Sequence, residues 1–287
     1  AKVVASASDD LANKVVEEVS KNSTEENQTL SAQVLKAIVD SDSGKIEIIN
    51  NDVKETMIKQ TIESAQNQQE GTGVQQTQDM TSIISDIIVN SNTETGSKMI
   101  EELNNSSIDT DSNLSLQVIS AISEKDTTKL NTLSENNKEQ IDTLTESAVK
   151  NAGASQEDAD LIANVVANAS DEFANQIIGE VTKNSTNENQ ALSAKVMKSI
   201  VESNPDKIEN LNDENKENMI NQTIEAAKNQ AEGSSTDDID LSNTIAEIVT
   251  NSDNETAAKV LESLEEASTN SDSKLSLSVV SNLTKQE

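Results

Sequence analysis

One short stretch, Leu30-Ser31-x-x-Val34, occurs again at Leu114-Ser115-x-x-Val118, Leu192-Ser193-x-x-Val196 and Leu275-Ser276-x-x-Val279. The four copies begin 84, 78 and 83 residues apart. Local turn chemistry does not recur over such distances, whereas a duplicated structural unit does. The spacing therefore predicts a tandem repeat, and the structure of one repeat decides the fold.

The repeat is visible over almost the whole chain. AKVVASASDD at residues 1–10 aligns with ANVVANASDE at residues 163–172, a shift of 162 residues. The match continues through residues 57–68 and 219–230, and it persists beyond them at a shift of 161 residues. A weaker copy lies between the two, so the basic repeat is about 81 residues and the stronger similarity is that of a double repeat.

Apolar spacing within the first repeat predicts helices over residues 9–22, 27–40, 45–68 and 79–90, because apolar residues recur three or four positions apart. The intervening Asn-Ser, Asp-Ser-Gly and Gly-Thr-Gly segments are typical of turns and helix ends. The serines Ser8 and Ser155 precede acidic residues as helix caps do. We expect an all-α fold of tandem helical hairpins, stacked either as an α-solenoid or as a string of small bundles.

The helices pair as hairpins of two kinds. Two-short-helix hairpins are predicted near residues 1–23, 77–107, 154–185 and 234–268, and hairpins of one short and one long helix near 24–71, 108–153 and 186–233. A single helix remains at 269–287. The predicted repeat units are residues 1–76 (beginning in mid-unit), 77–153, 154–233 and the partial unit 234–287.

A strand is the alternative for residues 274–283, where KLSLSVVSNL alternates apolar and polar residues. The corresponding segment QALSAKVMKSI, from Gln190, does not alternate and fits a helical period. Because one repeat position should adopt one structure, we expect a helix.

The composition favours a thin, repeated core. Only 33% of the 287 residues are hydrophobic, Phe173 is the only aromatic residue, and Trp, Tyr, Cys and His are absent. A large single core normally uses aromatic side chains, whereas aliphatic layers suffice when each layer touches only its neighbours. The regular apolar spacing argues against disorder, the other reading of such a polar chain.

The net charge of −31 arises from 52 acidic residues and 21 basic residues, all of them lysine. This surface repels nucleic acid and anionic membranes, because binding to both depends on cationic side chains. No apolar run reaches the roughly 20 residues of a membrane span. The lack of cysteine excludes disulfides and thiolate metal sites. We therefore expect neither a nucleic-acid partner nor direct membrane insertion.

The residue types required for common catalytic mechanisms are missing. The chain has no His for proton transfer, no Cys nucleophile, and no glycine-rich phosphate-binding loop among its seven glycines. Most carboxylates fall on predicted solvated helix faces. We predict that the protein is not an enzyme.

One segment, Asp40-Ser-Asp42-Ser-Gly44, resembles half of a calcium-binding loop. It lacks the third ligand before the glycine and the later glutamate, and the ligand set does not recur in the other repeats. A turn is therefore expected, with no specific cofactor. Diffuse binding of Ca²⁺ or Mg²⁺ to the acidic surface remains open.

Two sets of lysines recur. The first set opens the predicted long helix, where a cation opposes the helix dipole, so a carboxylate on the adjacent hairpin is a candidate partner. The second set lies within that helix, where we expect ordinary solvated charge, with ion pairing between repeats as the alternative. The first set is Lys45, Lys129 and Lys207; the second is Lys54, Lys138 and Lys216.

The Leu-Ser-x-x-Val stretch continues four residues later with another aliphatic residue, which makes one stripe on one helix face. No base or oxyanion donor accompanies its serine, which we interpret as a small residue that lets a neighbouring helix approach. We predict that the stripe packs successive repeats together through Leu30, Val34, Ile38, Leu114, Val118, Ile122, Leu192, Val196, Ile200, Leu275, Val279 and Leu283.

These features favour a structural role. The first hypothesis is a repeat segment of a long extracellular or cell-surface fibrous protein (a stalk, filament or matrix fibre) whose partners are its own repeats, by end-to-end or lateral self-assembly. Because the chain starts and stops in mid-repeat, we expect an excerpt of a longer array or a chain that joins its own copies. An α-solenoid binding scaffold and a length-setting helical protein of a phage tail or secretion device are the alternatives.

Overall fold

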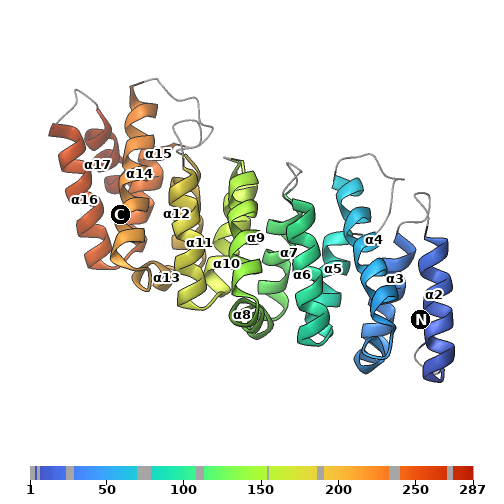
Figure 1. Ribbon diagram of the computed structural model, residues 1–287. Helices are drawn as coiled ribbons and strands as arrows, with labels where there is room; N and C mark the ends of the chain where they lie inside the picture. Colours follow the sequence, from blue (N-terminus) through green and yellow to red (C-terminus); the bar gives the residue numbers. More distant parts are fainter. Residues whose placement is uncertain are drawn as a thin grey trace. The chain divides into compact units, whose positions relative to one another are not determined.

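The computed structural model describes residues 4, 7–23, 29–69, 79–107, 113–153, 155–185, 191–232, 240–269 and 274–286. Within these ranges the chain forms helices and no strand (Figure 1). The all-α prediction is confirmed. The alternating segment near residue 274 is also helical, as α17 (Leu275–Gln286).

The chain divides into two compact units, which we call the N-terminal unit (Ala1–Asn151) and the C-terminal unit (Ala152–Glu287). The predicted repeat boundaries at 76/77 and 233/234 lie outside the described residues. The 81-residue repeat and its four predicted segments therefore stay predictions.

In the N-terminal unit the helices form two layers (Figure 1). The first layer is a row in which α3, α5 and α7 contact one another in turn, and the second is a row of α2, α4, α6 and α9. The bounds are α2 (Asp9–Asn22), α3 (Thr29–Ser41), the 3₁₀ helix η2 (Ser43–Ile46), α4 (Asn51–Gln69), α5 (Met80–Asn90), α6 (Thr93–Ser107), α7 (Leu114–Lys125), α8 (Thr127–Asn136) and α9 (Lys138–Asn151).

The C-terminal unit has the same two layers. Helices α10, α12, α15 and α17 form one row, and α11, α14 and α16 form the other. The bounds are α10 (Gln156–Asn168), α11 (Asp171–Asn184), α12 (Ala191–Ser203), α13 (Asp206–Glu209), α14 (Asp213–Ala231), α15 (Leu241–Asn251), α16 (Asn254–Thr269) and α17 (Leu275–Gln286). In both units, each hairpin contributes one helix to each layer.

Several helices begin at a residue whose side chain bonds the free backbone N–H groups of the first turn. The Asp79 carboxylate accepts from Thr81 and Ser82 at the start of α5, and Asp240 makes the same contacts at the start of α15. Ser155 caps α10 as predicted, by accepting from the Asp158 N–H at 3.0 Å. Ser8 occupies the cap position of α2, but its side chain makes no capping hydrogen bond.

The predicted long helix over residues 45–68 is wrong, because it is broken in each repeat. In the first repeat η2 ends at Ile46 and α4 begins only at Asn51. The corresponding breaks separate α8 from α9 and α13 from α14. Apolar spacing concealed the first break, because Ile46 and Ile49 are both buried although the chain between them is not helical.

An asparagine on the preceding hairpin stabilises two of the breaks. The Asn13 side chain donates to the Ile48 carbonyl at 2.8 Å and accepts from the Asn50 N–H at 2.7 Å. Asn175 donates to the Asn210 carbonyl at 3.3 Å and accepts from the Asn212 N–H at 2.7 Å. These bonds satisfy backbone groups that the broken helix leaves free.

The remaining repeat has Ser97 where the others have asparagine, counting from the Leu-Ser-x-x-Val stretch. Serine lacks the paired donor and acceptor of an amide. In this repeat the segment before the break remains helical for ten residues, as α8. The asparagine is therefore associated with the wider break.

Asn175→Ala should lower the stability of the protein, because two backbone groups of the break at residues 210–212 lose their partner. We expect a loss of about 1–3 kcal/mol. Urea denaturation followed by circular dichroism measures it, and Asn218→Ala, a change at an exposed position of α14, is the matched control. Equal midpoints for the two variants would contradict this role of Asn175.

Candidate functional site

The predicted packing residues lie on α3, α7, α12 and α17, which are first-layer helices in their respective units. Nine of them are buried: Ile38, Leu114, Val118, Ile122, Leu192, Val196, Ile200, Leu275 and Val279. Leu30, Val34 and Leu283 are partly exposed. The stripe thus lies mainly in the aliphatic core of each unit, and its role in setting repeat-to-repeat packing stays a prediction.

The serine of the stretch does more than leave space. Ser193 is buried and donates to the Gln222 side-chain oxygen at 2.5 Å, while its hydroxyl also lies 2.7 Å from that of Ser185. The Gln222 amide donates to the Thr182 carbonyl at 2.7 Å. These contacts form a polar relay that joins α11, the residue following it, α12 and α14.

The same relay recurs in the first repeat. Ser31 donates to Gln60 at 2.6 Å and lies 2.8 Å from the Ser23 hydroxyl. Gln60 donates to the Ser20 carbonyl at 3.0 Å. In the last helix Ser276 contacts Ser268 in the same way. Sequence reasoning missed the relay because the glutamine lies 29 residues beyond the serine.

One repeat has lost the glutamine. Counterpart positions are those at the same distance from Leu30, Leu114, Leu192 and Leu275, and Leu144 is the counterpart of Gln60 and Gln222. Leu144 is fully buried, so an apolar contact replaces the amide there.

The lysines that precede the breaks bind the preceding hairpin. Lys207 donates to the Ala169 carbonyl at 2.6 Å and lies 3.0 Å from the Asp171 carboxylate. Lys45 makes the equivalent contacts with the Ala7 carbonyl at 3.2 Å and Asp9 at 3.3 Å. The expected carboxylate on the adjacent hairpin is thus present in both copies.

Lys129 makes only the backbone contact, to the Ser91 carbonyl at 2.6 Å, among the printed partners of its ammonium group. Burial lowers the pKa of Lys129, and the charge of Asp126 offsets this effect in part. In all three copies the ammonium group lies at the turn between the two helices of the preceding hairpin, where a cation offsets the partial negative charge at a helix carboxyl end.

The second set of lysines is not uniformly solvated, as we had expected. Lys54 and Lys216 are buried, and Lys138 is exposed. Lys216 donates at 3.2 Å to the carbonyl of Glu209, the last residue of α13. Its side chain therefore packs along α14 and places the charge at a helix carboxyl end.

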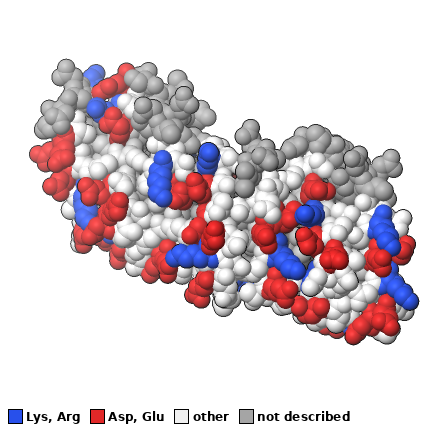
Figure 2. All heavy atoms as spheres, viewed as in Figure 1, with Lys and Arg blue, Asp and Glu red and all other residues white. Residues whose placement is uncertain are grey.

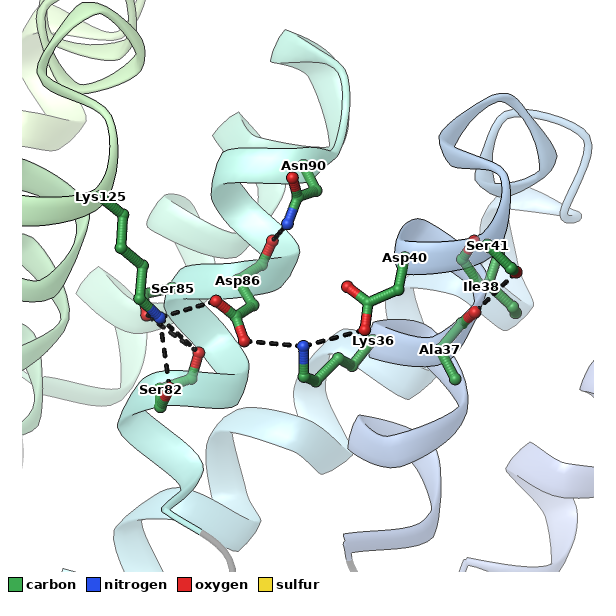
Figure 3. Close-up of polar contacts among 10 residues, drawn as sticks. All are labelled: Lys36, Ala37, Ile38, Asp40, Ser41, Ser82, Ser85, Asp86, Asn90 and Lys125. Atoms are coloured by element: carbon green, nitrogen blue, oxygen red, sulfur yellow. Dashed lines mark hydrogen bonds and ion pairs between the residues drawn. The ribbon is translucent and has the colours of Figure 1, made fainter.

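An ion-pair bridge joins three consecutive first-layer helices of the N-terminal unit (Figure 3). Lys36 on α3 and Lys125 on α7 approach Asp86 on α5 from opposite sides, each with a nitrogen–oxygen distance of 2.7 Å. Lys36 also pairs with Asp40 at 3.0 Å. Burial alone would raise the pKa of Asp86, but the hydrogen bonds and charges of the two lysines outweigh burial and lower it.

The C-terminal unit keeps part of this bridge. Lys198 lies 3.6 Å from Glu247, the counterpart of Asp86. Burial opposes the charge of Lys198, but the carboxylates of Glu202 and Glu247 raise its pKa. The counterpart of Lys125 is Gln286.

Acidic side chains are spread over the face shown in Figure 2, with lysines among them. Where carboxylates gather on α4 and α6, burial and the charges of Glu55, Glu101 and Glu63 raise the pKa of Glu102 against the opposing charge of Lys59. Within the described ranges no three acidic residues are arranged to hold a metal ion. Asp42 of the half-calcium motif instead accepts from the Gly44 N–H at 3.1 Å and caps η2.

A polar groove of about 290 Å³ lies beside α10 and α12, lined by Asp160, Ala163, Asn164, Ser199, Glu202 and Ser203. Its carboxylates are bound by the protein. Asp160 accepts from Ser199 at 2.6 Å and from Gln156 at 2.7 Å, and Glu202 pairs with Lys198 at 2.5 Å. These bonds connect neighbouring helices, so the groove is part of the polar packing between hairpins.

Comparison with known proteins identifies no family. No family model matches the chain, and no curated protein matches it. One matching solved structure is described as "Computational Design of Self-Assembling Cyclic Protein Homooligomers", is 16% identical, and is aligned over 94% of this chain and 96% of that one. Its TM-score of 0.18 is too low to support any conclusion about this chain.

Ser193→Ala should destabilise the protein by about 1–3 kcal/mol, because the buried oxygen of Gln222 loses its hydrogen-bond donor. Replacing the pair together, as Ser193→Ala/Gln222→Leu, should cost less than the sum of the two single changes, since Leu144 occupies this position in another repeat. Denaturation of all three variants measures the coupling. Strict additivity would show that the relay is not a cooperative contact.

Asp86→Asn should reduce stability at neutral pH by up to about 1 kcal/mol, the usual value of a partly exposed ion pair. Because folding lowers the pKa of Asp86, wild type gains stability above the ordinary value of 3.8 and loses it as the pH falls through the lower folded value. The difference between variant and wild type should therefore shrink in acid.

Urea denaturation of both proteins from about pH 7 to about pH 2.5 measures this effect. The double variant Lys36→Met/Lys125→Met is the companion control, since it keeps the carboxylate and removes its partners. It should also recover relative to wild type as the pH falls. A difference that is constant across this range would contradict the assignment.

Proposed function

We propose that this chain is a structural repeat segment of a long extracellular or cell-surface fibrous protein. In this role it acts as a stalk, filament or matrix fibre, and it assembles through repeat-to-repeat packing. The observation that carries the proposal is the recurrence of the same lysine contact at the turn of the preceding hairpin, at Lys45, Lys129 and Lys207.

A recurring contact of this kind suits a spacer. Each hairpin binds the one before it through the same aliphatic layers and the same lysine, so the repeat can be added without a new interface. A binding scaffold would instead need surface residues that differ between repeats and a concave face rich in aromatic residues and arginine. The chain has no arginine, and its single aromatic residue, Phe173, is buried.

The proposal includes a non-catalytic role. The polar groups with the most defined geometry, namely the serine–glutamine relays, the lysine contacts and the Asp86 bridge, all join one helix to another. Their chemistry is that of structural hydrogen bonds and ion pairs. No helix of the described residues is long and apolar enough to cross a membrane.

An acidic surface suits an exposed fibre because like charges keep neighbouring molecules apart and soluble. The net charge of −31 also makes lateral association sensitive to cations, which bridge or screen carboxylates. In this proposal divalent ions act diffusely over the surface and not at a fixed site.

Electron microscopy of the protein isolated from its source cells, with antibody labelling of intact cells, tests the proposal. We expect elongated particles and surface labelling. Compact particles confined to the cell interior would contradict it.

EDTA treatment tests the cation dependence separately. If divalent ions bridge neighbouring molecules, lateral bundles should disperse in EDTA and return with Ca²⁺ or Mg²⁺, while the helical signal stays constant. Bundles that do not respond would remove divalent bridging and leave the fibre itself in place.

A further inference from the structure

Four large aliphatic side chains among the described residues are strongly exposed, and they lie on only three helices. Leu11 on α2 is 49% exposed, Leu261 on α16 is 43% exposed, and Leu277 and Val280 on α17 are 72% and 52% exposed. Single exposed aliphatic residues are ordinary, but a group on adjacent helices marks an interaction surface. Helices α16 and α17 contact each other.

We call Leu261, Leu277 and Val280 the trailing face. The counterparts of Leu277 and Val280 in α12 are Ala194 and Met197, and both are fully buried. Helix α12 is contacted by α14 and α15, which follow it in the chain. Among the described residues, α17 is contacted by α14, α15 and α16, which all precede it.

The first repeat shows the same relation. Ala32 and Leu35 of α3 are the counterparts of Leu277 and Val280, and they are buried where α4 and α5 follow and contact α3. Ile100 of α6, the counterpart of Leu261, is also buried, and α6 is contacted by α8 and α9. A trailing face inside either unit is thus covered by the next helices of the same repeat array.

A complementary surface lies on α2, which we call the leading face: Leu11, Val15 and Val19, four residues apart on one side of the helix. Leu11 is exposed, and the two valines are partly exposed. Their counterparts are buried in α6 and α16, which contact the preceding helices α4 and α14. These counterparts are Thr95, Met99 and Leu103 in α6, and Thr256, Val260 and Leu264 in α16.

We propose that the trailing face of one molecule binds the leading face of a second copy of this chain, head to tail. The duplicated sequence supports this partner, because inside each unit a trailing face meets the helices that follow it and a leading face meets those that precede it. A second copy supplies the missing leading face with the same kind of side chains. The inference deepens the proposed fibre by assigning the surfaces of its end-to-end contact.

Such a contact joins two different surfaces and is therefore heterologous, so it propagates into open chains unless the rotation closes a ring. The acidic surface opposes it, because two molecules of net charge −31 repel each other at low ionic strength. Association should therefore strengthen as salt screens this repulsion, which also favours aliphatic burial.

The test is sedimentation of the purified full chain in moderate salt from about 1 µM to about 1 mM, where weak association becomes populated. Wild type should form a concentration-dependent series of dimers and longer chains. Leu277→Gln/Val280→Gln should weaken the association by about tenfold or more, since two aliphatic contacts are lost. Asn218→Gln/Asn221→Gln, at exposed positions of α14, is the matched control and should behave as wild type.

A mixing experiment distinguishes head-to-tail contact from other modes. Leu11→Gln blocks the leading face, and Leu277→Gln/Val280→Gln blocks the trailing face. Each variant alone should remain largely monomeric, whereas a mixture should form a heterodimer that grows no further. Circular dichroism verifies that both variants keep the helical content of wild type.

Three results would overturn the inference: a wild type that stays monomeric throughout, association that is unaffected by both variants, or self-association of the Leu11→Gln variant equal to that of wild type. The last result would indicate contact between like faces. Surface labelling without association would sink this inference alone. Association of a chain that is confined to the cell interior would sink the proposed function and leave the end contact intact.

Discussion

The structure depends on one constraint: a hairpin with a single aliphatic stripe cannot bury that stripe by itself. Ordering the backbone costs about 1–2 kcal/mol per residue, whereas full burial of an aliphatic side chain contributes about 1.5–3 kcal/mol. In α3, Leu35 and Ile38 are buried in a layer that also holds α5, with α4 behind it. The favourable term therefore becomes sufficient only when neighbouring hairpins cover both sides. This explains why a chain with one aromatic residue folds as layers instead of around a single deep core.

Aliphatic burial is not directional, so it does not by itself choose the register between two hairpins. The polar contacts supply this choice. Lys207 reaches the carbonyl that ends the preceding helix, and Ser193 and Gln222 connect three segments at fixed atoms. A slip of one residue would leave the buried Gln222 oxygen without a donor, which costs more than the bond itself contributes. The polar contacts thus act mainly by making alternative packings unfavourable.

The sequence alone predicts the helices and their pairing because a regular apolar period is a local signal. It fails where two distant segments decide the outcome. Nothing near Ile46 and Ile49 indicates the break between them, because the stabilising Asn13 lies on the preceding hairpin. The serine of Leu-Ser-x-x-Val was recognised as a repeated residue, but its partner could be found only by comparing glutamines 29 residues further on. Lys54 is buried although its sequence neighbourhood is polar, since tertiary packing decides its exposure.

The polar contacts also show which repeat length the structure follows. The asparagine at the break and the serine–glutamine relay occur in the first and third repeats, 162 residues apart, as Asn13 with Gln60 and Asn175 with Gln222. The intervening repeat has Ser97 and Leu144 at these positions, and its segment before the break is the longer helix α8. It keeps the lysine contact through Lys129. The aliphatic stripe and the lysine therefore follow the shorter repeat, whereas the amide contacts follow the double repeat. Two adjacent repeats have diverged in how they fix register, and their duplication as a pair has preserved that difference.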